Sequence, residues 1–192
     1  VPALYSNSLS EIRSCAAEAA ALLEAGRQAA QGQDDEDTFE VVAQYVRQLT
    51  PSTACCYFKY LVESDALVCV AASGDGASAL LGLTIKRGER VTGWVGANHQ
   101  TVSNADPALD LGQAAHLLRE FPRSTLSTPV MLKENSHFGG VLTSFSPKPN
   151  AFTSDHVYAL EQLSAILAEH SRFNRKDTDR LLSFPHRLQG TH

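Results

Sequence analysis

Apolar residues recur with a helical period near both ends of the chain and with a strand period between them. Near the start, Ser8 and Glu11 form a capping box, and the apolar positions that follow step by three and four. A second helical pattern stops before Pro51, and a closing one begins at Thr153 or Ser154, which are both good helix caps. The predicted helices span residues 8–31, 38–49 and 151–175.

Five segments between these helices are rich in β-branched, aromatic and other apolar residues and are bounded by turn residues, as is typical of strands. An insert of mixed character separates the third predicted strand from the fourth. The strands are predicted at 53–62, 66–73, 80–86, 124–134 and 137–147, and the insert has a helical turn at 93–100, an extended stretch at 101–106 and a short helix at 112–121. Grouped strands with helices outside them predict an α+β fold, in which an antiparallel sheet carries helices on one face and the insert on the other.

The first predicted helix carries a heptad seam of small and apolar residues. The seam consists of Leu9, Ile12, Ala16, Ala19, Leu23, Gly26 and Ala30. Such a seam is typical of a helix that pairs with another helix. We therefore expect a homodimer that forms through the terminal helices, and we expect Leu23→Asp to weaken self-association.

Two longer stretches together resemble a known family. They are "GERVTGWVGANHQTVSNAD" at 88–106 and "RSTLSTPVMLKENSHFGGVLTSFSPKPNAFTSDHVYALEQLSAILA" at 123–168. In order and spacing they are similar to the GAF domain family, and the resemblance covers about residues 36–170. It implies a profilin-like antiparallel sheet of five to six strands between a helical layer and a ligand-side insert. We expect a connector or dimerisation helix at 1–33, a GAF-like sensor domain at 34–172 and a connector or tail at 173–192.

The resemblance also implies a function. GAF domains are mostly sensory modules that bind cyclic nucleotides, tetrapyrroles or amino acids, or that only dimerise. The chain opens on Val1-Pro2 and carries no effector signature, so we expect a piece of a longer bacterial signalling protein. The expected output domain is an enzyme of cyclic-di-GMP turnover, such as a diguanylate cyclase or phosphodiesterase, or a histidine kinase. We expect a non-catalytic sensor of an unidentified small molecule, with its cofactor unknown, that signals through its flanking helices.

A structural dimerisation module is the alternative function. In that case the pocket is filled by the chain itself and binds no ligand. The insert offers apolar side chains for this purpose, namely Leu109, Leu111, Leu117, Leu118 and Phe121.

Eight residues are candidates for contact with a ligand, on the basis of their place in the resemblance or their chemistry. They are Phe58, Trp94, Asn104, Asp106, Phe121, Arg123, Ser127 and Ser144. Packing in the core is favoured over ligand contact for Trp94, and a turn cap is favoured for Asp106. Phe58 shares a strand face with Cys56, but the pattern leaves open which layer that face meets.

Composition argues against several other classes of protein. The formal net charge is −5 and no basic stripe is present, which argues against a nucleic-acid partner. The apolar runs are too short to cross a bilayer, so we expect no membrane partner. Neither a dinucleotide fingerprint nor a P-loop occurs around Gly88, Gly93 and Gly96.

The cysteines and histidines predict neither a thiol relay nor a metal centre. The four cysteines, Cys15, Cys55, Cys56 and Cys69, form no C-x-x-C pair, and none follows residue 69. GAF proteins that reduce free methionine sulfoxide use cysteines in the insert, which here has none. The histidines are dispersed. Reduced core cysteines favour a cytoplasmic protein.

Cyclic-nucleotide binding stays open. The GAF domains that bind these ligands often carry an N-K…F-x-x-x-D-E pattern, of which this chain keeps Lys148, Phe152 and Asp155. The Asn–Lys pair is missing, and His156 stands at the place of the second acid. Asp155 is also explained by its place in the first turn of a helix.

Overall fold

The structure is a computed structural model that describes residues 8–29, 35–132 and 137–170. A six-stranded sheet in the order β3-β2-β1-β6-β5-β4 runs through it, and every neighbouring pair is antiparallel. The strands are β1 Ala54–Leu61, β2 Ala66–Gly74, β3 Thr84–Lys86, β4 Val102–Ala105, β5 Ser124–Leu132 and β6 His137–Ser146. The α+β prediction is confirmed, and the extended stretch of the insert supplies the sixth strand, β4.

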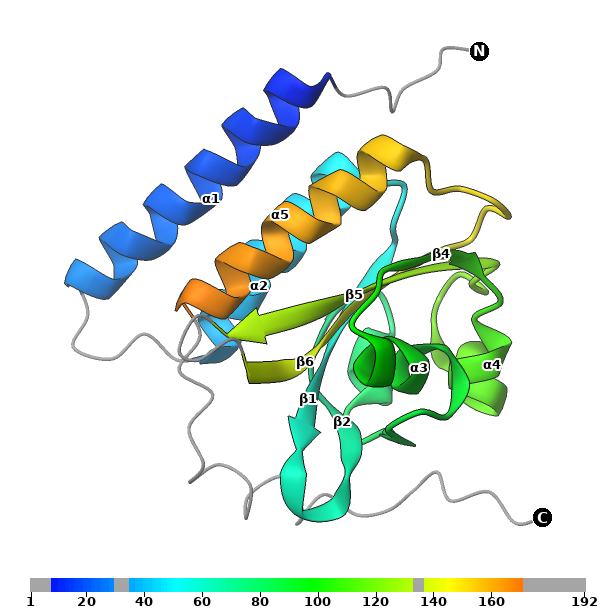
Figure 1. The fold of residues 1–192 in the computed structure, drawn as a ribbon. Helices are drawn as coiled ribbons and strands as arrows, with labels where there is room; N and C mark the ends of the chain where they lie inside the picture. The colour runs from blue at the N-terminus through cyan, green and yellow to red at the C-terminus, as the bar shows by residue number, and fades with distance from the viewer. Residues whose placement is uncertain (1–7, 30–34, 133–136, 171–192) are drawn as a thin grey trace, which may run out of the picture.

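Helices cover both faces of the sheet (Figure 1). One layer contains α1 Leu9–Ala29, α2 Asp35–Leu49 and α5 Ser154–His170, and the insert on the other face contains α3 Arg90–Asn98, α4 Ala108–Leu111 and the 3₁₀ helix η3 Gly112–Leu117. Two further 3₁₀ turns are η1 Val62–Ser64 and η2 Ala77–Leu80. The arrangement confirms that a helical layer and an insert enclose the sheet.

Several element boundaries differ from the prediction. The helix predicted from residue 38 begins at Asp35. In the strand predicted at 80–86 only Thr84–Lys86 is extended, because Gly82 at a φ of 83° turns the chain and donates its N–H to the carbonyl of Cys69. The helix predicted at 112–121 is a 3₁₀ helix that ends at Leu117, because the backbone of Leu118 is extended, with a φ of −71° and a ψ of 141°.

Two hydrophobic cores lie on opposite faces of the sheet because successive strand residues point to opposite sides. Cys55 and Tyr57 of β1 belong to the core beneath α1, α2 and α5. Cys56 and Phe58 belong to the core beneath the insert, together with Val95 of α3. The question left open by the sequence is therefore answered: Phe58 faces the insert.

The heptad seam of α1 is buried within the chain. Ile12, Ala19 and Leu23 are at most 1% exposed and share a core with residues of α2 and α5. An apolar stripe requires an apolar partner but does not specify which one, and here the same chain supplies it. The prediction that a second copy covers this seam is wrong for these residues. The C-terminal connector at 173–192 and the boundary at 33/34 lie outside the described residues.

Leu23 tests this arrangement. We expect Leu23→Ala to lower the free energy of unfolding by about 2–5 kcal/mol, because it leaves a cavity between α1 and the rest of the helical layer. The neighbouring Leu22 is 55% exposed, so Leu22→Ala is a matched control with an expected change within about 0.5 kcal/mol. Urea denaturation measures both variants. A dimer that dissociates in Leu23→Ala with unchanged monomer stability contradicts the intramolecular seam.

Candidate ligand site on the insert

Helix α3 lies close to the edge of the sheet because its sequence contains Gly93. A Cβ added at Gly93 would lie 2.2 Å from the carbonyl oxygen of Lys86, at the end of β3. Only glycine allows this approach of the two backbones. Arg90, the first residue of α3, has a φ of 58°, a left-handed conformation that is uncommon for a residue with a side chain.

The first turn of α3 binds the carboxylate of a distant residue, Asp110 of α4. Oδ1 accepts hydrogen bonds from the backbone N–H groups of Val91 at 2.9 Å and Thr92 at 3.1 Å. Oδ2 accepts the Thr92 N–H at 3.1 Å and the Thr92 hydroxyl at 2.6 Å. Glu89, at the N-cap position, makes no side-chain cap. Because N–H groups of a first turn lack helical partners and the helix dipole favours negative charge, Asp110 is the cap of α3.

Burial governs the electrostatics of this carboxylate. Asp110 is 0% exposed, and the four hydrogen bonds that the described structure gives its carboxylate all come from neutral donors. Arg90 donates instead to the backbone carbonyl of Asp110, at 2.8 Å. Burial therefore raises the pKa of Asp110, although hydrogen bonds from Thr92 and Val91 and the charge of Arg90 oppose the shift.

A row of hydroxyl groups continues from Asp110 into the sheet. The Thr92 hydroxyl lies 3.4 Å from that of Thr143 on β6, which lies 3.0 Å from that of Ser127 on β5. Thr125, two residues from Ser127, therefore lies on the same face of β5, and its buried hydroxyl has no hydrogen-bond partner among the described residues. The insert and the sheet thus meet through polar groups as well as through the core.

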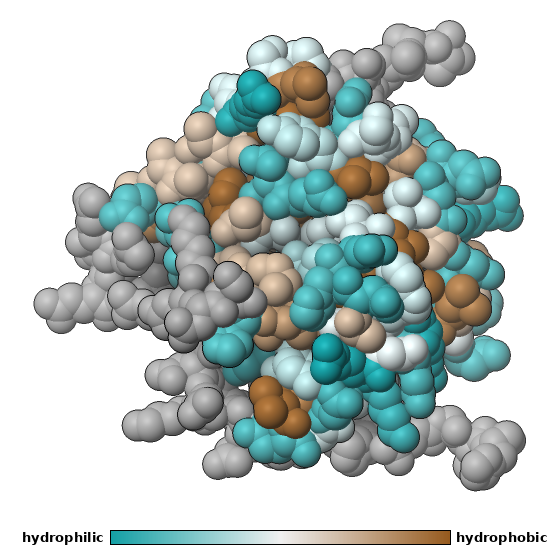
Figure 2. Space-filling model, viewed as in Figure 1, coloured by the Kyte–Doolittle hydropathy of each residue, from teal (hydrophilic) through white to brown (hydrophobic). Residues whose placement is uncertain are grey.

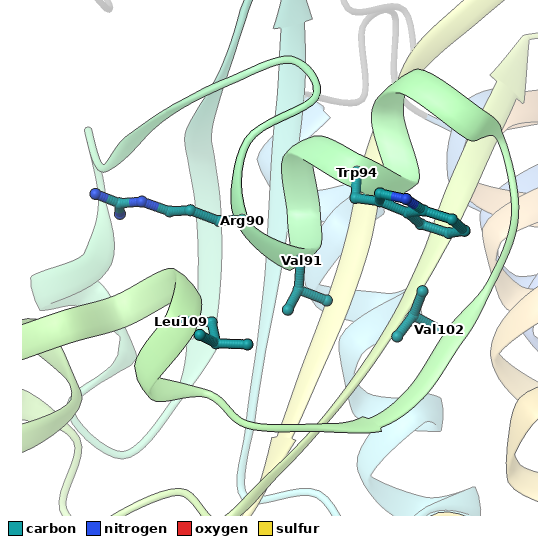
Figure 3. A pocket seen from close by; sticks show the side chains of 5 residues that line it. All are labelled: Arg90, Val91, Trp94, Val102 and Leu109. Carbon is teal, nitrogen blue, oxygen red and sulfur yellow. The ribbon is translucent and has the colours of Figure 1, made fainter.

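A groove of about 370 Å³ opens beside this polar row, lined by Arg90, Val91, Trp94, Val102 and Leu109. In Figure 3 the side chains of Val91, Val102 and Leu109 project into one space beside the Trp94 ring, while the guanidinium of Arg90 points away from it. Trp94 is 40% exposed, so the favoured interpretation of it as a core residue is wrong. The volume falls within the range of small-molecule sites, which is about 300–1,000 Å³.

Comparison with known proteins identifies the family. The family model described as "GAF domain" matches residues 32–170, which is more than half of the chain. The chain belongs to the GAF domain family. GAF domains are sensory and regulatory modules, so the prediction of the family and of its general role is confirmed. No curated protein matches.

Solved structures share the GAF fold at low sequence identity. The GAF domain from a phosphoenolpyruvate-protein phosphotransferase of Coxiella burnetii has a TM-score of 0.69 and 19% identity, over 84% of this chain and 93% of that chain. Free methionine-R-sulfoxide reductase from Neisseria meningitidis, in complex with its substrate, has a TM-score of 0.65 and 20% sequence identity, over 86% of this chain and 92% of that chain. The chromophore binding domain of Stigmatella aurantiaca phytochrome P1 has a TM-score of 0.58 and 15% sequence identity, over 85% of this chain and 62% of that chain.

Two of the eight predicted contact residues lie at or beneath the groove of this GAF domain. Trp94 lines it and Ser127 belongs to the hydroxyl row. Phe58 is fully buried in the core beneath the insert. Ser144 lies on the opposite face of the sheet from Thr143, and its buried hydroxyl has no hydrogen-bond partner in the described part of the chain.

The other four predicted residues have different surroundings. Asn104 binds the backbone of Phe152 through both ends of its amide, at 2.8 and 2.9 Å, and Asp106 caps α4 by accepting the N–H of Ala108 at 2.9 Å. Phe121 is 48% exposed beside the ring of His116, and Arg123 is exposed. None of the four lines the groove.

Three of the four cysteines of this GAF domain are buried in the sheet. Cys55, Cys56 and Cys69 lie on β1 and β2 and are at most 1% exposed. Burial raises the pKa of Cys55, whereas a hydrogen bond from the Cys56 thiol to Cys69, together with burial, raises the pKa of Cys56. Thiols that stay protonated are weak nucleophiles. Among the described residues, no three His, Cys, Asp or Glu side chains gather as they would around a metal ion.

No helix in the described part of this GAF domain has both the length and the apolar character that crossing a membrane requires.

Removal of the buried carboxylate is expected to destabilise the domain. Asp110→Ala leaves buried N–H groups of Val91 and Thr92 without an acceptor, and we expect a loss of about 2–4 kcal/mol in the free energy of unfolding. Asp106→Ala is the matched control, because it also removes a capping aspartate of the insert but from an exposed site, with an expected loss of about 1 kcal/mol. Equal losses in urea denaturation contradict the role of Asp110 as the cap of α3.

The raised pKa of Asp110 predicts a pH dependence. A folded-state pKa above the unfolded value means that the folded state binds the proton more tightly. The associated stability is therefore fully present below the unfolded pKa of about 4 and is lost as pH rises through the raised value. Relative to Asp110→Asn, the wild-type domain is expected to lose stability as pH rises through this window. Denaturation at a series of pH values measures this difference, and a flat difference contradicts the prediction.

Proposed function

We propose that this GAF domain senses a small molecule at the groove on its insert and has no catalysis of its own. The observation that carries the proposal is the position of the groove, directly beside the buried hydrogen bonds between Asp110 and the first turn of α3. An occupant that contacts Val91 of α3 and Leu109 of α4 touches both of the elements that Asp110 joins. Binding there therefore has a means of altering how the insert packs on the sheet.

Strand β4 supplies a route from the groove to the helical layer. Val102 of β4 lines the groove, and Asn104 of the same strand holds the backbone of Phe152 just before α5. Just before β4, Thr101 donates to the Glu161 carboxylate of α5 at 2.7 Å. A displacement of β4 is thus passed to α5, and α5 packs against α1. We propose that these flanking helices carry the signal to an output domain.

The cysteines argue against the chemistry of one similar structure. Free methionine-R-sulfoxide reductase shares the fold, and a thiol relay needs an accessible thiolate. In this chain Cys55, Cys56 and Cys69 are buried in the sheet between the helical layer and the insert. Cys15 lies on α1, on the far side of the sheet from the groove. The placement of the thiols supports a module without reductase activity.

The proposed context is a bacterial signalling protein in the cytoplasm, with an enzyme of cyclic-di-GMP turnover or a histidine kinase as its output. The GAF domain of a phosphotransferase among the similar structures is an example of this module within a larger enzyme. A homodimer through the terminal helices remains part of the proposal. It would use the outer surface of α1, where Leu22 is exposed, because the seam is buried.

A dimerisation module without a ligand is the second candidate, and one observation favours it. Leu111 and Leu118 of the insert are buried in the core between the insert and the sheet. Leu109, Leu117 and Phe121 do not take part, since they are 45–57% exposed. On the face shown in Figure 2, apolar residues are separated by polar ones, which is unlike a large dimer interface.

The lone tryptophan allows a direct test. Trp94 is the only tryptophan in the sequence, so intrinsic fluorescence reports on the groove. In a screen of nucleotides, amino acids, tetrapyrroles and carboxylic acids, we expect a ligand to change this fluorescence and, at saturation, to raise the melting temperature by about 5–10 °C. Leu109→Arg should abolish both effects. Leu117→Arg, at a similarly exposed leucine outside the groove, should preserve them. A screen in which no compound changes either signal favours the dimerisation module.

A further inference from the structure

The first turn of α3 receives its cap from another element. Glu89 makes no cap of its own, and the donors of Val91 and Thr92 converge on the two oxygens of Asp110. These donors would fit the carboxylate of a free molecule equally well, because they are neutral N–H and O–H groups at a helix N-terminus. The turn is therefore a complete carboxylate receptor whose present occupant belongs to the chain.

A second, independent observation points to a ligand at this place. The hydroxyl of Thr125 is fully buried on the insert-facing side of β5 and has no hydrogen-bond partner among the described residues. It lies next to the row of Ser127 and Thr143 that supports Thr92. A buried hydroxyl without a partner is unfavourable, and a polar group that enters this space would supply the partner.

The element that carries Asp110 is suited to local release. Helix α4 has four residues between Pro107 and Gly112, far fewer than an isolated helix needs for stability. Gly112 has a φ of 50°, and a Cβ placed there would meet nothing within 4 Å, so this end of α4 faces open space. The flanking Leu109 is exposed. Movement of α4 therefore gives up the hydrogen bonds of the Asp110 carboxylate, the bond from Arg90 to the Asp110 carbonyl and the burial of Leu111.

Exchange of one carboxylate for another favours a particular kind of ligand. The burial that raises the pKa of Asp110 is relieved when Asp110 returns to water, and this gain offsets the desolvation of an incoming acid. Asp110 is nevertheless tethered, which gives it a high effective concentration. A competing acid needs further contacts, and the groove of Val91, Trp94, Val102 and Leu109 adjoins the receptor, since Val91 belongs to both.

We propose that the first turn of α3 is a carboxylate-binding site that Asp110 occupies in the unliganded domain, and that the sensed ligand is an amphipathic carboxylate. Its acid group replaces Asp110 at Val91 and Thr92, and its apolar body lies in the groove against Trp94. Replacement frees α4 and so changes the insert. The inference rests on the proposed function, since it names the ligand class of that same site.

Chemical rescue tests the receptor. We expect formate and acetate to raise the melting temperature of Asp110→Ala by about 3 °C or more, because they fill the vacated site. Formamide, and sodium chloride at the same ionic strength, should not do so. Asp106→Ala and the wild-type protein should show no effect specific to the carboxylates. If Asp110→Ala is folded by circular dichroism and formate acts no differently from chloride, the receptor is refuted.

The wild-type domain provides the second test, which does not depend on the folding of a variant. A series of short-chain fatty acids and arylacetates is titrated while Trp94 fluorescence and the backbone N–H resonances of Val91 and Thr92 are followed. We expect saturable binding by at least one acid. Its primary amide should bind at least about tenfold more weakly, as should the acid to Thr92→Val, since a charged partner is lost in one case and a donor in the other.

The outcomes separate this inference from the proposed function. Equal binding of acids and amides, or binding of neither series while other compounds act at the groove, refutes the carboxylate site and leaves the sensor intact. Absence of any ligand in both this series and the wider screen refutes both.

Discussion

The insert of this GAF domain depends on one buried carboxylate. Asp110 supplies the acceptor for the N–H groups at the start of α3, and those groups have no alternative acceptor in their own turn. The interaction joins α4 to α3 and, through Thr92 and Thr143, joins both to the sheet. It stabilises the insert while Asp110 stays buried in this place, although burial disfavours the charged form of its carboxyl group. The insert needs this contact, but burying the carboxylate is unfavourable. This is the kind of contact that a ligand could replace in the proposed sensor.

The two faces of the sheet are covered by different kinds of element. The helical face is covered by long helices with a continuous apolar core, in which the seam of α1 is buried. The insert face combines a core around Phe58 with a polar row and is covered by short elements. Short elements have few contacts each and therefore open at lower cost than long helices. The asymmetry places the short elements on the insert face, where the proposed ligand binds, and the long helices on the face proposed to carry the output.

The sequence predicts the architecture well because apolar periodicity and turn residues are local signals. The three long helices and five of the strands follow from that periodicity, and β4 from the extended stretch. Asp110 could not be found in this way, because its partners lie 18 and 19 residues away and it stands between two leucines like any surface charge. The sequence also could not predict which surface covers the α1 seam, since a heptad pattern shows that a helix needs an apolar partner but not which one. The one available signal was the lack of a good cap residue before α3, which implied a cap from elsewhere.

The proposed coupling between the groove and the flanking helices rests on where β4 is anchored. Its Val102 faces the groove, while Asn104 holds Phe152 and the preceding Thr101 holds Glu161, so one short edge strand contacts the ligand side and α5 together. An edge strand pairs with a neighbour on one side only, and it therefore shifts at less cost than a strand inside the sheet. The hydroxyl row ends on β5 and β6, which are internal strands paired on both sides. In the proposed function, a change at Asp110 is converted into movement of α5 relative to the sheet, and α1 follows because its seam is packed against α5.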